Sequence, residues 1–459
     1  MARTGHVLML RPLLPALAGL ALVATPPLRA TPADASLPAI PSGLPEVRLP
    51  SRLTLDGAMQ LFEANGLDLL IADAAVESAR GDERIARAIA NPAVGGGWAT
   101  AHHYDPGQCP DLTCSSTQWT ANASDQGAIV DWLSGKRHLR IETAKAALEA
   151  ARHSRADAER TLGEALKQQY LAAALAQSGL VFARESAETS ERTLRLVEVR
   201  YRAGAVSEAD SARAEAAKLE TDQAVDEARQ ALRQARVGLA FLLGVRGEVP
   251  DFAVGDELVR LAVPAALVGA TPESLLATAR AQRRDLMAIE SQRLRATTAL
   301  ALARRQRFPD VQLSFNYTQQ GTGQSAIQPP TAGVSASLTI PVFYQYQGEV
   351  AKAEADLRTQ ELQWAKIRAQ VRSDVETGFA AFEGSHRRAE RMESRLLGSA
   401  ERARELVGIQ YEKGAASLLE LLDAQRTVIA TRMERLQDLD DYWSAVFALE
   451  AAVGQELRP

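Results

Sequence analysis

The chain has 459 residues, a formal net charge of −5, two cysteines and six histidines. A mildly acidic chain offers no basic field for nucleic acid, so we expect no nucleic-acid partner. Two cysteines cannot build a disulfide scaffold, and so few cysteines and histidines are unusual for a metal enzyme. Aromatic residues make up 5% of the chain, while alanine, leucine, arginine and glutamate are abundant, which favours long helices.

The N-terminus has the features of a secretory signal, and we predict a signal peptide over residues 1–30. Arg3 and Arg11 supply positive charge, residues 13–24 form a short apolar run, and small residues follow. The run is too short to span a bilayer as a helix, so a cleaved signal is favoured over the alternative, a membrane anchor. Residues 31–52, rich in proline, alanine and serine, predict an extended leader. An exported chain without a later apolar run of about 20 residues is either soluble or inserted as β-strands.

Two helical stretches of equal length start 217 residues apart. The first begins at Thr54 and ends at Pro92; the second begins at Thr271 and ends at Pro309. Threonine is a good N-cap, and proline disfavours helix at the residue before it. Because Asn-Pro and Phe-Pro end both helices at matching positions, the chain contains an internal repeat.

After each proline the hydrophobic period changes from that of a helix to that of a strand. Residues 311–317 alternate apolar and polar, and a return strand over residues 334–340 does the same. In the first copy Val94, Trp98 and Tyr104 share one parity, and the return strand is expected within residues 117–132. Each strand therefore has an apolar and a polar face, and in an exported protein the apolar face can contact lipid. Aromatic residues that fit an interfacial belt, or ordinary packing at strand ends, are Trp132, Phe343 and Tyr344.

The loop between the first two strands is longer than its counterpart and contains Cys109 and Cys114. We interpret this pair as a disulfide that closes an exposed loop in an oxidising compartment. A metal site with the neighbouring His102 and His103 is the alternative, although Cys-x4-Cys beside His-His is not a standard ligand spacing. We therefore predict no metal ligands.

Two very long helices follow, over residues 135–202 and 347–413. The first contains no proline and would extend about 100 Å at 1.5 Å per residue. A returning helix of about 36 residues follows each, ending at Gly244 and Gly454. Helices of this length predict coiled-coil packing or the staves of a helical barrel.

A short motif joins each long helix to its returning helix. Tyr201, Gly204 and Ser207 recur as tyrosine, glycine and serine 210 residues later. Each motif predicts the tip of a helical hairpin, because glycine ends a helix and serine begins one. The predicted organisation is a first repeat, a connector, a second repeat and a tail, over residues 53–244, 245–270, 271–454 and 455–459.

The predicted fold is mainly α with a membrane β-barrel portion, built from a duplicated helix-strand-strand-helix repeat. Four strands cannot close a barrel, and lipid does not tolerate an open sheet edge. Closure therefore requires several chains. Three chains would supply twelve strands, within the range of outer-membrane barrels. The expected assembly is a homotrimer whose 12-stranded β-barrel is continued by a long α-helical periplasmic barrel.

The order of elements, the duplicated tip and the Asn-Pro and Phe-Pro strand starts resemble the TolC-type outer membrane efflux family, over about residues 53–454. Residues 66–76, together with Gly135-Lys136-Arg137, resemble its CzcC-like branch, which serves RND pumps for divalent heavy-metal cations. The resemblance implies a passive exit duct in the outer membrane of a Gram-negative bacterium, spanning into the periplasm. It also implies outer membrane lipid, a periplasmic adaptor protein and an inner-membrane RND pump as partners.

The resemblance also assigns a periplasmic gate. In the family, acidic residues six and nine places after the tip glycine surround the aperture; they correspond to Asp210, Glu420 and Asp423. The ninth place of the first copy is Arg213, so one acid is missing. In a trimer the carboxylates should repel one another, raise some of their pKa values and attract cations. The alternative is that these acids merely occupy first helical turns, where acids are common.

Further roles follow from the same resemblance. Tyr411 matches a tyrosine that bonds to the acid at the position of Asp210 and holds the closed state. The basic residue expected two places after the second tip glycine is Ala416, so one closing tether is absent. The tip residues that match the adaptor contacts are Gly204, Ala205, Val206, Gly414 and Ala415.

We find no catalytic motif in the sequence, so we expect neither an enzyme nor a cofactor. Two alternatives keep the family fold and change the cargo: a duct for drug efflux, or a duct for type I protein secretion. A more distant alternative is a soluble periplasmic coiled-coil scaffold, against which the alternating strands argue.

Overall fold

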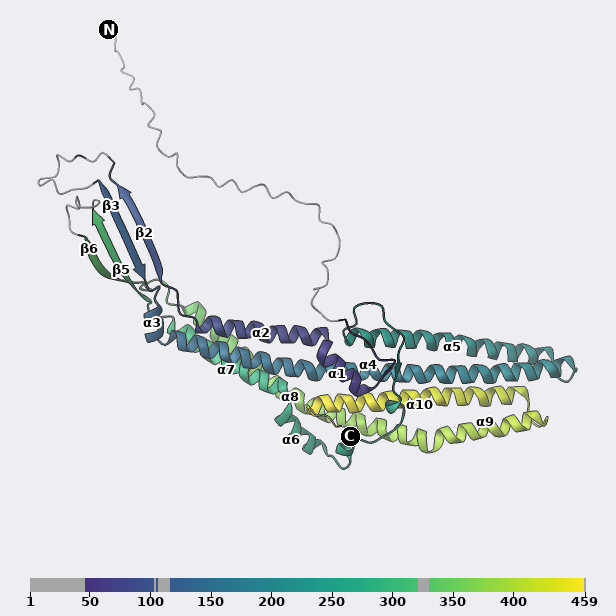
Figure 1. Cartoon of the computed structure of the whole chain (residues 1–459). Coiled ribbons are helices and arrows are strands. Elements are labelled where there is room, and N and C mark those ends of the chain that lie inside the picture. Colours follow the sequence, from purple (N-terminus) through teal and green to yellow (C-terminus); the bar gives the residue numbers. More distant parts are fainter. Residues whose placement is uncertain (1–45, 103–104, 106–115, 321–329, 458–459) are drawn as a thin grey trace, which may run out of the picture. The chain divides into compact units, whose positions relative to one another are not determined.

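The computed structural model describes residues 46–102, 105, 116–320 and 330–457. The described residues from Val47 onward belong to one compact unit. The predicted signal peptide, most of the predicted leader, Tyr104 and the Cys109–Cys114 pair lie outside the described residues. Figure 1 gives the labels of the helices and strands.

The two halves of the chain contain the same series of elements. The first half comprises α1 (Leu55–Asn65), α2 (Leu67–Arg87), β2 (Ala93–Thr100), β3 (Thr117–Ser124), α3 (Ala128–Leu133), α4 (Lys136–Arg202) and α5 (Glu208–Leu242). The second half comprises α6 (Pro272–Gln282), α7 (Arg284–Arg305), β5 (Val311–Gln320), β6 (Thr331–Leu338), α8 (Gln347–Arg391), the π-helix η5 (Met392–Leu396), α9 (Leu397–Glu412) and α10 (Leu418–Val453). Short pieces β1 (Arg52–Leu53), β4 (Ala253–Val254), η2 (Glu257–Val259) and η3 (Ala265–Leu267) belong to the N-terminal and connecting segments.

Each predicted first helix is in fact two helices, so the prediction of one continuous helix is wrong. The first break is at Gly66, where a Cβ would lie 2.7 Å from the Phe62 carbonyl oxygen. The second break is at Arg283, which is 4% exposed. Its guanidinium forms ion pairs with the Asp285 carboxylate at 2.6 Å and the Asp374 carboxylate at 2.7 Å. Arg283 also donates to the Ala452 carbonyl, so this break is fixed by contacts with α8 and α10.

The long helix of the first copy is confirmed as α4, which runs without interruption for 67 residues. The prediction of one continuous helix over residues 347–413 is wrong in one respect. The π-helix η5 inserts a π-helical turn between α8 and α9. Both returning helices, α5 and α10, are confirmed, with 35 and 36 residues. Within the described ranges no helix combines the length and hydropathy needed to cross a membrane.

The four longer strands form one antiparallel sheet in the order β2-β3-β5-β6. The register places Val94, Ala123, Phe315 and Val334 side by side across all four strands. The opposite face carries polar and small residues, including Asn122, Asn316 and Ser335. The predicted alternation is thus confirmed, with the return strand of the first copy at Thr117–Ser124. Predicted strand residue Ile340 lies beyond the end of β6, and Trp132 lies in α3, a short helix that we did not predict.

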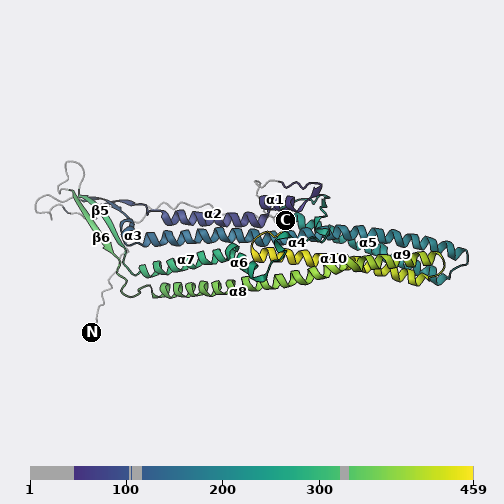
Figure 2. The ribbon, with the colours of Figure 1, turned by 90° about the horizontal axis from the view of Figure 1, so that it is seen from below.

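The apolar face of this sheet is exposed. Val94 and Val334 are each 80% exposed, and Trp98 is 59% exposed. The ring centres of Trp98 and Trp119 are 6.4 Å apart. Among the described residues each outer strand, β2 or β6, pairs with one neighbour. The sheet continues from the ends of α2, α4, α7 and α8, and both hairpin tips lie at the other end of the helices (Figures 1 and 2).

The main core lies where α1, α4, α10 and the connector meet. The side chains of Phe62, Tyr170, Tyr442 and Phe447 are almost completely buried there. The Tyr170 hydroxyl donates to the Glu257 carboxylate at 2.8 Å and accepts from the Gly255 N–H at 2.9 Å. These bonds hold the connector against the middle of α4, well away from both the sheet and the tips.

Candidate functional site

The two hairpin tips, residues 203–207 (tip 1) and 413–417 (tip 2), have the same backbone structure. Gly204 and Gly414 adopt the left-handed conformation, with φ of +72° and +76°, which favours glycine. Beyond each glycine the chain turns back. The Ala205 N–H donates to the Arg200 carbonyl at 2.9 Å, and the Ala415 N–H donates to the Gln410 carbonyl at 2.8 Å. Each tip is therefore a Schellman motif followed directly by a new helix.

The two acids six places after the glycines belong to capping boxes. The Asp210 carboxylate accepts from the Ser207 hydroxyl at 2.8 Å, and the Ser207 oxygen accepts from the Asp210 N–H at 3.1 Å. In tip 2 the Glu420 carboxylate accepts from the Ser417 N–H at 2.7 Å and from its hydroxyl at 2.9 Å. Both acids thus stabilise the starts of α5 and α10, as the alternative interpretation of the acids expected.

These hydrogen bonds lower the pKa values of both acids. The Ser207 hydroxyl, with its N–H and Arg213, lowers the pKa of Asp210. The Ser417 N–H and hydroxyl lower the pKa of Glu420. In the single chain the shifts are therefore opposite to the increase expected from repulsion, because hydrogen bonds to the charged form dominate.

The ninth places after the glycines differ between the tips. Arg213 forms an ion pair with Asp210 at 3.1 Å. Asp423 is exposed, and its carboxylate has no ion-pair or hydrogen-bond partner among the described residues. Beside tip 1 the Asp210–Arg213 pair is neutral, whereas beside tip 2 the Asp423 carboxylate has no ionic partner among the described residues.

Beside the tips, the two hairpins pack against each other through a small apolar cluster. Its buried members are Val197, Ala214, Tyr411, Leu418, Leu421 and Leu422. Arg200 of α4 crosses to the second hairpin, where its guanidinium lies 4.6 Å from the centre of the Tyr411 ring. It also donates to the Tyr411 and Glu412 carbonyls at 3.3 and 3.1 Å.

The expected bond between Tyr411 and Asp210 is not formed within this chain. Tyr411 is 3% exposed, and its hydroxyl has no hydrogen-bond partner among the described residues. The Asp210 carboxylate is engaged by Ser207 and Arg213 instead. Sequence reasoning missed Arg200, although the repeat contains a signal: the matching position in the second copy is the uncharged Gln410.

A groove of about 750 Å³ lies between the tips. Four of the five predicted adaptor-contact residues line it, namely Gly204, Ala205, Val206 and Gly414. The fifth, Ala415, is exposed. Small side chains and turned backbone thus make up much of this end surface. No group of three or more histidine, cysteine or acidic side chains within the described ranges is arranged to hold a metal ion.

The Gly135-Lys136-Arg137 segment lies at the opposite end of α4. Lys136 is 7% exposed and donates to the Asp310 carboxylate at 2.7 Å and to the Phe308 carbonyl at 2.8 Å. Arg137 donates to the Arg87 carbonyl at 2.6 Å. This segment therefore ties the start of the long helix to the start of β5 and to the end of α2, where helix gives way to strand.

A family profile described as outer membrane efflux protein matches residues 58–245 and 275–455. The chain belongs to the outer membrane efflux protein family. Both matched segments run from a first helix through a strand pair and a hairpin tip, so the family match covers the duplication as well as the site. Members are efflux channels of the outer membrane, and the relatives include proteins described by metal resistance and by pyoverdine export.

Two relatives and one solved structure are similar to this outer membrane efflux protein over much of its length. The cobalt-zinc-cadmium resistance protein CzcC of Cupriavidus metallidurans is 23% identical over 407 residues, 88% of this chain and 90% of the relative. The pyoverdine export outer membrane protein OpmQ of Pseudomonas aeruginosa is 26% identical over 309 residues, 66% of this chain and 63% of the relative. A crystal structure of CusC superposes with a TM-score of 0.71 at 21% identity, covering 87% of this chain and 92% of CusC, which establishes the fold.

Proposed function

We propose that this chain is the outer-membrane exit duct of a tripartite efflux system. Three copies would form a closed channel that conducts cargo passively from a periplasmic adaptor and an inner-membrane RND pump to the exterior. The observation that carries the proposal is the four-stranded sheet. It has an exposed apolar face and two outer strands that each pair with one neighbour among the described residues, and it is joined to helices that end in the two tips.

The sheet supports this function on physical grounds. Exposed side chains such as Val94, Val334 and Phe315 would be costly in water as one continuous face, and lipid removes that cost. The free edges of β2 and β6 cannot remain unpaired in lipid, because each unsatisfied backbone group costs several kcal/mol. Pairing β2 of one copy with β6 of the next satisfies both edges, so the sheet closes in a ring of copies, and three copies give the twelve strands of the expected homotrimer.

The tips would form the periplasmic opening and the adaptor contact. We assign the gate to Asp210, Glu420, Asp423 and Tyr411, with Asp423 as the acid that faces the opening most freely. The adaptor would contact the small residues of the tips. Three copies would bring three Asp423 carboxylates together, and a ring of carboxylates favours the passage of cations over anions.

We infer that divalent heavy-metal cations are the cargo, as the name of CzcC suggests for a relative that matches nearly the whole chain. The second candidate is pyoverdine or a similar organic molecule, because OpmQ is described as a pyoverdine export protein. A deletion strain grown with zinc, cobalt, cadmium, nickel, copper and a panel of drugs tests the first candidate. Increased sensitivity to divalent metals supports the first candidate; unchanged tolerance to every metal overturns it and leaves the duct standing.

The gate assignment has its own experiment. In planar bilayers, the wild-type channel should be blocked by a trivalent cation such as hexamminecobalt(III). Combining Glu420→Ala with Asp423→Ala should weaken that block, since the carboxylates that attract the cation are gone. The matched control is Glu208→Ala, an exposed acid of the first turn of α5. Equal block of the double variant and the wild type would contradict the gate assignment.

A further inference from the structure

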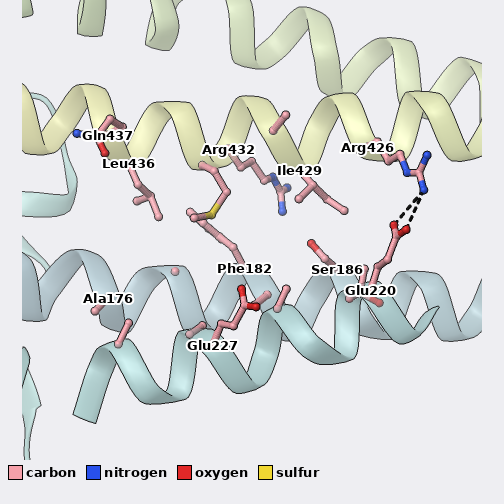
Figure 3. Close-up of a pocket in the computed structure, with 18 of the residues that line it drawn as sticks. Ala176, Phe182, Ser186, Glu220, Glu227, Arg426, Ile429, Arg432, Leu436 and Gln437 are labelled. Carbon is pink, nitrogen blue, oxygen red and sulfur yellow. Dashed lines mark hydrogen bonds and ion pairs between the residues drawn. The ribbon is translucent and has the colours of Figure 1, made fainter. Parts of the chain in front are cut away.

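A second hollow lies between the α4–α5 hairpin and α10, and the gate does not use it (Figure 3). Its volume is about 730 Å³, within the range of roughly 300–1,000 Å³ that is typical of small-molecule sites. Figure 3 shows Phe182, Ile429 and Leu436 pointing into it from the two sides. We call this hollow the hairpin groove.

The walls of the hairpin groove are built to leave space. Alanines and a glycine at many lining positions of α4 and α5 keep their helices thin on this side, for example Ala176, Gly179 and Ala228. From α10 come Ile429 and Met433, the latter 53% exposed. Methionine is flexible and polarizable, so it adapts to apolar ligands of different shapes. The groove therefore offers an apolar surface that the chain itself does not fill.

Among the side chains that line the hairpin groove, carboxylates outnumber cations. Its two arginines are already paired: Arg426 with Glu220 at 3.0 Å, and Arg432 with Glu185 and Glu401 at 3.0 and 2.8 Å. Figure 3 shows the Arg426–Glu220 pair crossing from α10 to α5.

Two further carboxylates line the groove, those of Glu227 and Asp440. Glu227 accepts from the Gln223 amide at 2.9 Å, and neither acid has a cationic partner among the described residues. Asp440 is half-buried, and its burial, together with the neighbouring Asp441, raises its pKa. A bound cation would offset the free-energy cost of burying this carboxylate in its charged form.

We propose that the hairpin groove binds an amphiphilic organic cation of drug-like size. Its apolar body lies against Phe182, Ile429 and Met433, and its charge faces the carboxylates of Asp440 and Glu227. A neutral or anionic compound of the same shape gains the apolar contact without the charge pairing. The proposal goes beyond conduction through the gate and does not depend on which cargo the duct carries.

The dimensions argue against a helix of a second copy as the occupant. An α-helix with its side chains is about 10 Å across, whereas the groove spreads its volume along α4 from Ala172 to Ser190 and is therefore much narrower than a helix. The Arg426–Glu220 pair also joins the two sides, which interrupts a trough along the helices. A small molecule fits such a narrow groove better than a continuous helix does.

The experiment uses the full-length protein, purified in detergent in its native oligomeric state, and two ions of equal shape and opposite charge. Equilibrium dialysis should show saturable binding of tetraphenylphosphonium and much weaker binding of tetraphenylborate. Asp440→Asn should weaken tetraphenylphosphonium binding by about ten-fold and leave tetraphenylborate binding no weaker, because one charge pairing is lost. Asp226→Asn is the control, since this exposed acid of α5 pairs with Arg229 outside the groove.

A second variant tests the location of the site. Ala224 is an exposed residue of α5 that lines the groove, so Ala224→Trp should fill the space and abolish binding of tetraphenylphosphonium. Ala216→Trp, at an exposed position of the same helix outside the groove, should bind like the wild type. Unsaturable binding, or full binding by Ala224→Trp, overturns the proposal. Absent binding in the wild type, with Ala224→Trp disrupting the oligomer, also overturns it and assigns the groove to a second copy.

Discussion

Arg200 is the residue that joins the two hairpins of one chain at their tips. Its guanidinium covers the ring of Tyr411 and donates to two carbonyls at the end of α9. Ala416 stands where a basic residue was expected, and the guanidinium that contacts Tyr411 comes from the other hairpin. The two hairpins are thereby held together by a charged side chain placed over a buried aromatic ring.

The first prediction concerns this link. Arg200→Ala removes the cation–π contact and two charge-assisted hydrogen bonds, together worth about 1–2 kcal/mol at such a site. We expect the tips to separate more often and thermolysin to cut near the exposed Leu419 about ten-fold faster. Arg202→Ala is the control, because Arg202 is exposed and its ion pair is with Glu198 of its own helix. Equal cleavage rates for the two variants would contradict a joining role for Arg200.

The second prediction concerns the capping box of tip 2. The pKa of Glu420 lies below its ordinary value of 4.5, so the carboxylate stabilises the folded tip above that pH. This contribution should be lost as the pH falls through the lowered pKa. Hydrogen exchange of the Ser417 amide, corrected for intrinsic rates, should stay constant from about pH 7 to 5 and accelerate below that. Glu420→Gln retains a capping residue that does not titrate, and its exchange should lack the acid step.

At the scale of elements, local signals predicted where most helices begin and end. Thr54 and Thr271 cap α1 and α6, and Ser207 and Ser417 cap the returning helices. Each of these signals acts within a few residues, which is why sequence reading succeeds with them. The break at Gly66 also had a local signal, since Asn-Gly is a typical turn pair.

Two features of the elements could not be predicted, because distant residues fix them. The break at Arg283 lies in a stretch without glycine or proline, and it depends on Asp374 of α8 and the Ala452 carbonyl of α10. The sequence of η5, MESRL, likewise contains no helix breaker. At the tips, the sequence indicated the acids and glycines correctly as residues of the hairpin ends, but not the contact between Arg200 and Tyr411, which joins segments 211 residues apart.

The third prediction concerns η5. A π-helical turn inside an α-helix accommodates one extra residue, so deleting one residue there restores regular α-helix without rotating the flanking segments. We expect deletion of the exposed Ser394 to leave the Tm within about 3 °C of the wild type. Deleting the exposed Glu361 should prevent folding, since it rotates the rest of α8, including the buried Val371 and Val375, by about 100°. Comparable thermal unfolding of both deletions would contradict this account.

At the scale of the whole molecule, the apolar surface is divided between two places. The central core is covered by α1, α4, α10 and the connector, whereas the apolar face of the sheet is exposed in the single chain. The alternation of apolar and polar residues in β5 and β6 could be predicted from the sequence because side chains of a strand repeat with a period of two. The pairing of β3 with β5, which joins the two halves into one sheet, could not be predicted, because the register between distant strands leaves no local sequence pattern.

The fourth prediction compares the two faces of β6. Val334→Lys places a charge on the apolar face, which costs about 2–4 kcal/mol near the middle of a bilayer. Ser337→Lys places the same charge on the polar face and should be tolerated. The amount of folded oligomer in the outer membrane fraction, judged by its resistance to dissociation without heating, should fall sharply for Val334→Lys. Equal amounts of both variants would contradict the lipid-facing assignment.

The duplicated tips have a further consequence for symmetry. Their backbones are nearly interchangeable, with the same left-handed glycine, the same turn and the same capping box. Their charges are not, since Arg213 stands in one copy where Asp423 stands in the other. In a ring of three chains, six tips of almost equal shape would alternate between two electrostatic environments. Identical partner subunits that contact that end would therefore meet two kinds of site, one with the charges of the first hairpin and one with those of the second.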